Sequence, residues 1–255
     1  MKRTLATLLL LPSVFWAPAD AQQPCPDNPC PTVITKIGDC PDEGCRQGAF
    51  DPNHPYDPEL NKRKNVRSDD QQAVLRSIRW IKGLPDPTSL TECGSRDELK
   101  QLGEGQKITV LAWALTARKG SAEKCNCDIG KQAHADNHIV LVDPAVKTPT
   151  LAEDECRSVT AEFTPRVRVE HPNFTRLKLN PLIDPSWKPS QSNPSGKVLV
   201  RVTGLLMFDS AHFFHEPLTR DTNWEIHPVL KMEYCPSGKT CRADSDENWK
   251  DLDND

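Results

Sequence analysis

The pattern of apolar and polar positions changes near Gly105 and divides the chain into two parts. After this glycine, β-branched and apolar segments alternate with polar stretches, as buried strands alternate with loops. The predicted strands are residues 107–117, 137–142, 158–169, 197–208 and 224–234. Pro165 and Pro228 indicate bulges or edge positions, and Gly204 indicates a bend in the fourth strand.

Before residue 105 the apolar positions follow a helical period. Four apolar residues at steps of three and four predict a helix over 68–82, which a glycine and a proline end. A second short helix is predicted after Ser95–Glu98, which has the sequence of a capping box. Residues 66–105 are therefore interpreted as a segment of two short helices.

The order of the predicted elements favours a mainly β fold with short helices, of the α+β type. Residues 106–235 hold the five strands, with a weaker helix predicted at 173–183 between the third and the fourth. This order resembles the OB-fold, a five-stranded Greek-key β-barrel. A five- or six-stranded sandwich or roll with the same elements paired differently is the alternative.

Both ends of the chain lack such periodicity. Residues 22–65 are rich in Pro, Asp, Asn and Cys and predict an irregular arm, which disulfides rather than a core hold in shape. Residues 236–255 predict an acidic, polar and disordered tail.

Ten cysteines follow residue 21, and an even number is typical of disulfides in an exported chain. Their pairing stays open, except that Cys235 and Cys241 enclose a turn and are expected to close a local loop. Zinc bound by cysteines is the alternative, but no two cysteines have the two-residue spacing of a zinc knuckle. The arm contributes four of the ten: Cys25, Cys30, Cys40 and Cys45.

Residues 1–21 have the order of a secretory signal peptide. Lys2 and Arg3 precede an apolar run from Leu5 to Trp16, and small residues lead to a cleavage site after Ala21. The run is shorter than the roughly 20 residues of a membrane span. We therefore expect a periplasmic or secreted protein with no transmembrane span in the mature chain.

The charge balance bears on the partners. The formal net charge is −4, and removal of the signal peptide takes away more basic than acidic residues. Affinity for nucleic acid depends largely on neutralising phosphates with Lys and Arg. The acidic balance therefore disfavours nucleic acid as a partner.

Four short segments of the strand-rich region resemble a group of uncharacterised exported bacterial proteins. The resemblance supports the choice of the barrel segment, and it implies no mechanism because that group has no established activity. The segments are Pro165–Arg168, Val202–Gly204, Phe208–Asp209 with His212, and Trp224–Pro228.

Two long polar loops form the expected binding site. In an OB-like barrel the ligand lies between the loop joining strands one and two and the loop joining strands four and five. Here these are about residues 118–136 and 209–221, and five of the seven histidines lie in or beside them. Two adjacent aromatic residues in the second loop are candidates for a ligand contact or a loop anchor. The predicted ligand-binding residues are His138, Asp209, His212, Phe213, Phe214, Glu225 and His227.

A divalent metal such as zinc is the sharpest hypothesis for the same end of the barrel. Strand alternation places Glu225 and His227 on one face, and His138 begins the second strand, so these three are the predicted ligands. The alternative has no cofactor: His138 and His227 bond to the backbone, and His212 and His215 are solvated.

A nuclease resembling staphylococcal nuclease, which is also built on an OB barrel, is a further hypothesis. That family uses carboxylates for calcium and two arginines that clamp the phosphate. Asp143, Glu162, Arg166 and Arg168 are the nearest analogues in type, but their spacing does not reproduce the family pattern. We carry no role over and expect both arginines on a solvated strand face. No Gly-x-Ser-x-Gly elbow supports a serine nucleophile.

The sequence therefore favours an exported binding module of the cell envelope or extracellular space. Its partner would be a small molecule, a glycan or an envelope protein, bound between the two long loops. The alternative function is a metal-dependent hydrolase, of which a nuclease-like enzyme is one form, that uses the same histidines and carboxylates. A structural envelope component that docks through the arm is the third hypothesis.

Overall fold

A computed structural model describes residues 25–52, 55–130, 132–215 and 219–254. The predicted signal peptide lies outside these residues. The long strands are β2 (Lys107–Lys119), β3 (Asn137–Val142), β4 (Val159–Phe163), β5 (Val198–Phe208) and β6 (Trp224–Tyr234), and the short ones are β1 (Val74–Ser77) and β7 (Lys250–Asp251). The helices are α1 (Pro58–Lys64), α2 (Ile78–Lys82), α3 (Asp97–Leu102), α4 (Leu151–Asp154), α5 (Arg176–Ile183) and α6 (Ser210–His215).

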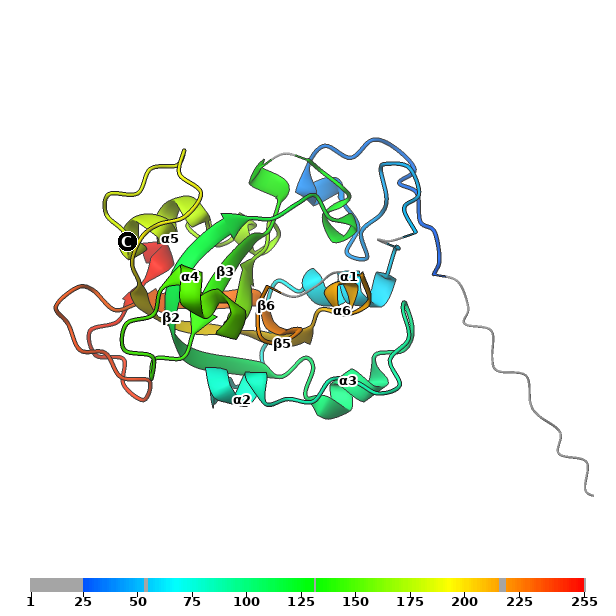
Figure 1. Cartoon of the computed structure of the whole chain (residues 1–255). Helices are drawn as coiled ribbons and strands as arrows, with labels where there is room; N and C mark the ends of the chain where they lie inside the picture. The colour runs from blue at the N-terminus through cyan, green and yellow to red at the C-terminus, as the bar shows by residue number, and fades with distance from the viewer. Residues whose placement is uncertain (1–24, 53–54, 131, 216–218, 255) are drawn as a thin grey trace, which may run out of the picture.

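The five long strands close into a barrel (Figure 1). Their order is β2-β3-β4-β6-β5, and β5 returns to pair with β2. The pairing of β4 with β6 is parallel and the other pairings in the barrel are antiparallel. This confirms the predicted mainly β fold with a closed five-stranded barrel, and it excludes the sandwich because no edge between β2 and β5 stays open.

The barrel interior follows from strand alternation. In β2, every second residue from Ile108 to Ala114 is fully buried, while the residues between them are partly exposed. Helix α5 packs against this strand through a side chain as well as through apolar contacts. Asn180 donates to the carbonyl oxygen of Ala117 at 3.0 Å and accepts from its amide at 2.8 Å. The helix between the third and fourth barrel strands is thus fixed to the first.

Gly204 marks a bulge in β5, as its position predicted. The register between β5 and β6 shifts on both sides of this residue. A Cβ atom at position 204 would lie 2.4 Å from the carbonyl oxygen of Pro228 and 2.5 Å from the side chain of Ile226. Glycine is therefore required because the two backbones approach closely at the bulge.

The predicted helix over 68–82 is wrong in its first half. Residues 74–77 form β1, which pairs in parallel with β2 from Ile108 to Leu111, and only residues 78–82 are helical. The apolar spacing fits a strand followed by a helical turn as well as one helix, and the pairing with β2 decides between them. Arg79 is exposed, as expected of the polar face.

The second predicted helix is present as α3, but its capping box is not formed. Glu98 instead accepts hydrogen bonds from the backbone and hydroxyl groups of Thr88 and Ser89. These four bonds lower the pKa of Glu98 to about 2, because they stabilise the carboxylate. The residue therefore holds a neighbouring loop rather than the start of its own helix.

The tail predicted to be disordered is ordered up to Asn254. The Cys235–Cys241 disulfide closes the expected local loop. Strand β7 then pairs with the end of β6, and Leu252 is fully buried in the main core. Polar contacts also hold this segment, since Asp246 pairs with Arg201 and Asp253 contacts His171 and Asn173.

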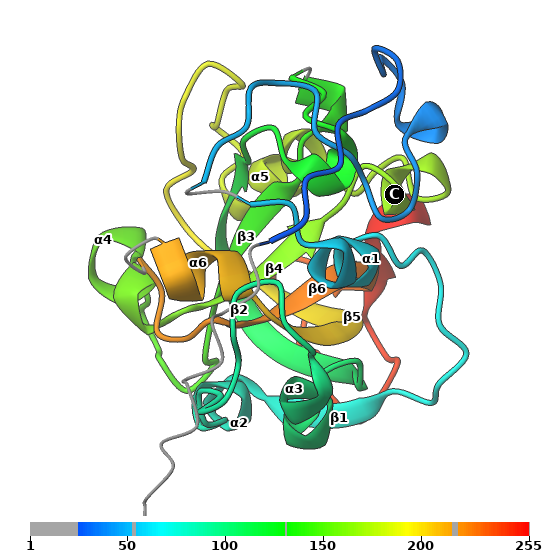
Figure 2. The ribbon, with the colours of Figure 1, turned by 90° about the vertical axis from the view of Figure 1, so that its right-hand side faces the viewer.

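The arm, which ends in helix α1, lies over one end of the barrel beside α6 (Figures 1 and 2). Eight of the ten cysteines form disulfides, whereas Cys125 is a buried thiol and Cys156 an exposed one, which corrects the expectation of full pairing. Three disulfides involve cysteines of the arm: Cys25–Cys93, Cys30–Cys45 and Cys40–Cys127. The arm therefore has an internal disulfide and two bonds to distant parts of the chain.

None of the helices in the described part of the chain has the length and apolar character that a membrane crossing requires.

Candidate functional site

Ionisable side chains from β3, β4, β6 and the predicted loop 209–221 meet at the barrel end that the arm covers. We call the following set the ion-pair network: His138, Glu162, His227, Glu225, Arg220, Asp209 and His212. Each member lies within 3.4 Å of the next, so the network runs without interruption from His138 to His212. It contains five of the seven predicted ligand-binding residues: His138, Asp209, His212, Glu225 and His227.

Strand geometry explains the first half of the network. His138 on β3 pairs directly with Glu162 on β4, so their side chains share a face, and Nε2 of the histidine lies 3.4 Å from Oε1 of the glutamate. Glu225 and His227 are two residues apart on β6 and also share a face, as predicted. Nδ1 of His227 lies 3.1 Å from Glu162 and 3.2 Å from Glu225.

Arg220 connects the second half. Its guanidinium lies 2.8 Å from Asp209 and 2.9 Å from Glu225, and all three side chains are buried. Asp209 also contacts Nδ1 of His212 at 2.6 Å. Because α6 begins directly after Asp209, His212 lies one helical turn beyond the carboxylate that it contacts.

Burial and pairing shift the protonation of these groups in opposite directions. Burial alone would lower the pKa of His227, but the carboxylates of Glu162 and Glu225 raise it well above the ordinary value. Burial alone would raise the pKa of Asp209, but His212, Lys64 and Arg220 hold it well below the ordinary value. Pairing with opposite charges therefore favours the protonated form of His227 and the ionised form of Asp209.

The arm adds a lysine to this end, and the loop after β2 supplies its partner glutamate. Lys64 at the end of α1 forms a 2.6 Å ion pair with Glu123, which lies in the loop between β2 and β3. Burial would lower the pKa of Lys64, but Glu123 and Asp209 raise it well above its ordinary value. This pair joins the arm to the loop from which the site is built.

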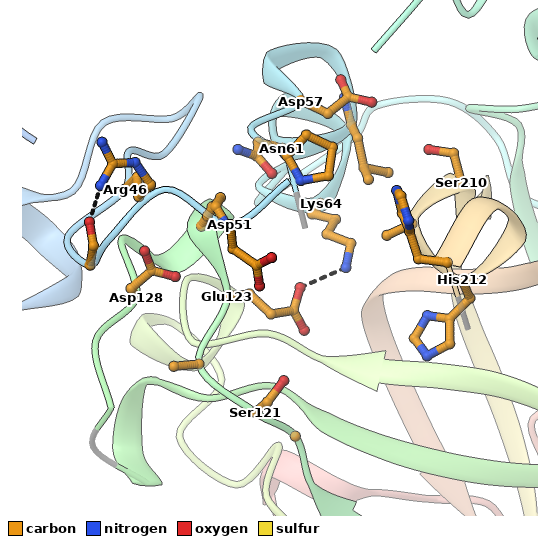
Figure 3. A pocket seen from close by; sticks show the side chains of 18 of the residues that line it. Arg46, Asp51, Asp57, Asn61, Lys64, Ser121, Glu123, Asp128, Ser210 and His212 are labelled. Atoms are coloured by element: carbon orange, nitrogen blue, oxygen red, sulfur yellow. Dashed lines mark hydrogen bonds and ion pairs between the residues drawn. The ribbon is translucent and has the colours of Figure 1, made fainter. Parts of the chain in front are cut away.

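A cleft of about 890 Å³ opens above the network, between the arm, α1, α6 and the loop after β2. Figure 3 shows Lys64 pointing across it toward Glu123, with His212 on the side of α6. His138 and His212 line the cleft with about a third of each side chain exposed. Both histidines also line a smaller pocket of about 100 Å³ beside Arg220.

The predicted ligand-binding residues divide into two groups. His138, His212 and Phe214 line the cleft, whereas Asp209, Glu225 and His227 are buried beneath it. Phe213 packs against the core, where its ring lies 5.2 Å from that of Phe208. The two adjacent phenylalanines therefore separate into a core contact and a cleft contact.

Several carboxylates gather near Glu162. Among the described residues, close groups of possible metal ligands include Glu123–His138–Glu162, Asp136–Glu162–His227 and Glu123–Cys125–Asp136. A fourth group, Cys30–Cys45–Cys127, consists of disulfide-bonded cysteines. His138 and His227 of the predicted metal set thus belong to two different groups that share Glu162, while Glu225 contacts Arg220.

Asp136 differs from the other buried acids. Burial, together with the charges of Glu123 and Glu162, raises its pKa to about 7. Its Oδ1 atom accepts from the amide of Asn126 at 3.2 Å, and its Oδ2 atom has no hydrogen-bond partner.

The residues compared with a nuclease have structural contacts. Asp143 accepts from the amide of Ala145 in a turn. The expectation that Arg166 and Arg168 lie on a solvated face is wrong, because Arg166 is 2 % exposed and Arg168 is half-buried. Arg166 donates to backbone oxygens of Pro41 and Cys125, and Arg168 donates to three further carbonyls. Both arginines hold loops together at the barrel end.

The sequence analysis missed Lys64, Glu123, Asp136 and Arg220 as members of this region, and it considered Glu162 only as a nuclease analogue. A charged residue within the apolar run of β4 is a usable signal for Glu162. Lys64 gives no such signal, because the arm brings it to the site from a distant part of the chain.

No family model matches the chain, and neither the curated proteins nor the solved structures give a significant match. These comparisons therefore lend no support to the resemblance to exported bacterial proteins or to a particular OB-fold family.

Proposed function

We propose that this protein is an exported binding module of the cell envelope or extracellular space, and that its ligand binds in the cleft between the arm and the barrel. The observation that carries the proposal is that His138 and His212 line the same cleft, each in contact with a buried carboxylate. A volume of about 890 Å³ lies within the range of small-molecule sites, roughly 300–1,000 Å³.

Two further features support this assignment. The strand order and the position of α5 between the third and fourth barrel strands agree with an OB-like barrel. The cleft lies at the loops after β2 and β5, which frame the ligand in barrels of that kind. The signal-like residues 1–21 and four disulfides support export into an oxidising compartment.

The lining favours a small polar molecule or a glycan. Lys64, Lys119 and Glu123 supply charges, Asn61 and Ser121 supply hydrogen-bonding groups, and the ring of Phe214 supplies an apolar surface. Sugars and other polyhydroxy ligands use this combination of polar groups and an aromatic face. The acidic net charge continues to disfavour nucleic acid.

The test is a screen of neutral and charged mono- and oligosaccharides and small polar metabolites by calorimetry. His138→Ala and His212→Ala are each expected to weaken binding of a positive compound at least tenfold. His171→Ala is the matched control, since His171 also contacts a carboxylate, Asp253, but does not line the cleft. A ligand whose affinity is the same in all three variants would overturn the proposed site.

A hydrolase is the second candidate, because a histidine held by a carboxylate is also an arrangement for general acid–base chemistry. Its test uses chromogenic ester, phosphodiester and glycoside substrates with and without added zinc or manganese. Turnover that is lost in His212→Ala and kept in His171→Ala would favour the enzyme over the binding module.

A further inference from the structure

Asp136, Glu162 and His227 converge inside the barrel end from three separate elements. Asp136 precedes β3, Glu162 lies on β4 and His227 lies on β6, and each offers one ligand atom within 4.8 Å of the other two. All three residues are at most 2 % exposed. Two carboxylates and an imidazole at such separations form a donor set suited to a divalent cation.

The hydrogen bonding of this cluster is incomplete. Asp136 uses Oδ1 for Asn126, and its buried Oδ2 atom has no hydrogen-bond partner. Nε2 of His227 is also buried without a partner. Buried polar atoms in proteins are usually hydrogen-bonded, since an unmade bond costs the full desolvation of the group. Two such atoms in one cluster indicate that a ligand belongs there.

The charges around the cluster point to a cation. Glu123, Asp136 and Glu162 interact electrostatically with one another. Lys64 is paired with Glu123, and Arg220 is paired with Asp209 and Glu225. Among the described residues no lysine or arginine forms an ion pair with Asp136. Lys64 and His227 act on Asp136 electrostatically but form no ion pair with it, so a cation beside this carboxylate would supply a direct counter-charge.

We propose that Asp136, Glu162 and His227 bind a divalent transition-metal ion of the zinc or manganese type. Glu225 contacts Nδ1 of His227 and is itself held by Arg220, so the imidazole has the carboxylate support that metal-bound histidines usually have. The second group, Glu123–His138–Glu162, shares Glu162 and reaches the cleft, which gives the ion a polar route to the interior. The site does not depend on which ligand the cleft binds.

The experiment uses the untagged protein in a Cys156→Ser background, because Cys156 is an exposed thiol and a thiolate is itself a zinc ligand. After treatment with EDTA and its removal, zinc chloride and manganese chloride are titrated by calorimetry. We expect one ion of at least one metal to bind per chain with micromolar or tighter affinity and to raise the melting temperature. Asp136→Asn and His227→Gln are each expected to weaken binding at least a hundredfold.

Asp253→Asn is the matched control and should bind like the parent protein, because Asp253 contacts a histidine outside this cluster. Circular dichroism verifies that each variant is folded, and Asp136→Asn is nearly isosteric and removes an unpaired buried charge. The proposal is overturned if neither metal binds at millimolar concentration or if Asp136→Asn and His227→Gln bind like the parent. It is also overturned if Glu123→Gln and His138→Ala weaken metal binding while Asp136→Asn and His227→Gln do not. The ion would then lie in the cleft-facing group Glu123–His138–Glu162.

Discussion

At the residue scale, Arg220 neutralises two buried carboxylates at once. It contacts Asp209 and Glu225, and its own side chain is 8 % exposed. Removing one partner of a buried ion pair leaves an uncompensated charge in a medium that solvates it poorly. The arginine is therefore expected to contribute to the stability of the folded protein.

We predict that Arg220→Met lowers the free energy of unfolding by about 3–5 kcal/mol, because two carboxylates lose their counter-ion. The measurement is urea denaturation followed by fluorescence at neutral pH. Arg242→Met is the matched control: Arg242 also pairs with an aspartate, Asp244, but both side chains are exposed. Its effect should stay within about 0.5 kcal/mol. Equal losses in the two variants would contradict a special role for the buried arginine.

Asp136 gives a pH-dependent contribution to stability. Its pKa is about 7 in the folded chain, against an ordinary value of 3.8. Because folding raises the pKa of Asp136, its contribution to stability is fully present below about pH 4, where the carboxyl is protonated in both states. This contribution decreases as the pH rises and is lost as the pH passes through 7, where the folded protein also ionises.

We therefore predict that the unfolding free energy of Asp136→Asn, relative to the parent protein, increases between pH 4 and pH 7 and then levels off. The increase is at most about 4 kcal/mol, from roughly three pH units at 1.36 kcal/mol each. Urea titrations at several pH values in the presence of EDTA measure it. A difference between the two proteins that does not change with pH would show that Asp136 is ionised throughout the range.

At the scale of single elements, the β5–β6 pair depends on the bulge at Gly204. The close approach of Pro228 and Ile226 leaves no room for a Cβ atom, and Pro228 is joined to His227 of the ion-pair network. The bulge therefore affects the strand that carries two network residues.

We predict that Gly204→Ala destabilises the protein by about 1–3 kcal/mol, because the strands must separate to admit the methyl group. Thermal and chemical denaturation measure the loss. Gly38→Ala is the control, since nothing lies within 4 Å of the added Cβ there. If both alanine variants are equally stable, the strands at the bulge adjust at no cost.

The elements show which parts of the fold local sequence determines. Long apolar runs such as residues 198–208 are recognisable as strands because they are rich in β-branched and apolar residues, which strands favour. Residues 74–77 have a weaker pattern, and they form a strand because β2 offers an edge for parallel pairing. The polar tail likewise becomes ordered through pairing with β6. Pairing between distant segments has no local signature, so these elements were mispredicted.

The site shows the same division. The loop histidines were found because titratable residues are dense there, and the shared face of Glu225 and His227 follows from strand alternation. Glu123 and Asp136 were missed because polar residues in a long loop do not indicate which of them face inward. Lys64 was missed because only the folded arm brings α1 to the loop between β2 and β3.

At the scale of the whole molecule, the arm forms one wall of the cleft. The Cys40–Cys127 disulfide joins the arm to the loop between β2 and β3 across a sequence separation of 87 residues. Such a bond restricts the unfolded chain more than a short loop does. It also fixes the arm opposite the barrel, so that stability and cleft shape depend on the same covalent link.

We predict that Cys40→Ser/Cys127→Ser lowers the free energy of unfolding by about 2–4 kcal/mol and weakens binding of a cleft ligand. Cys235→Ser/Cys241→Ser is the control, because that disulfide has a sequence separation of six and lies in the C-terminal segment. From loop entropy alone, removing this disulfide should lower the free energy of unfolding by about 2 kcal/mol less than removing Cys40–Cys127 does. Unchanged cleft binding in the first double variant would show that the arm holds its position without the disulfide.

The pairing of β6 with both β4 and β5 means that the barrel closes only when the last long strand is present. β6 is the last barrel strand to leave the ribosome, and it joins β4 to β5. A nascent chain that stops before Trp224 leaves two strand edges open and leaves Glu162 without the imidazole of His227. Closure of the barrel and formation of the Glu162–His227 pair therefore both require β6, so the barrel and the buried charges are completed by the same strand.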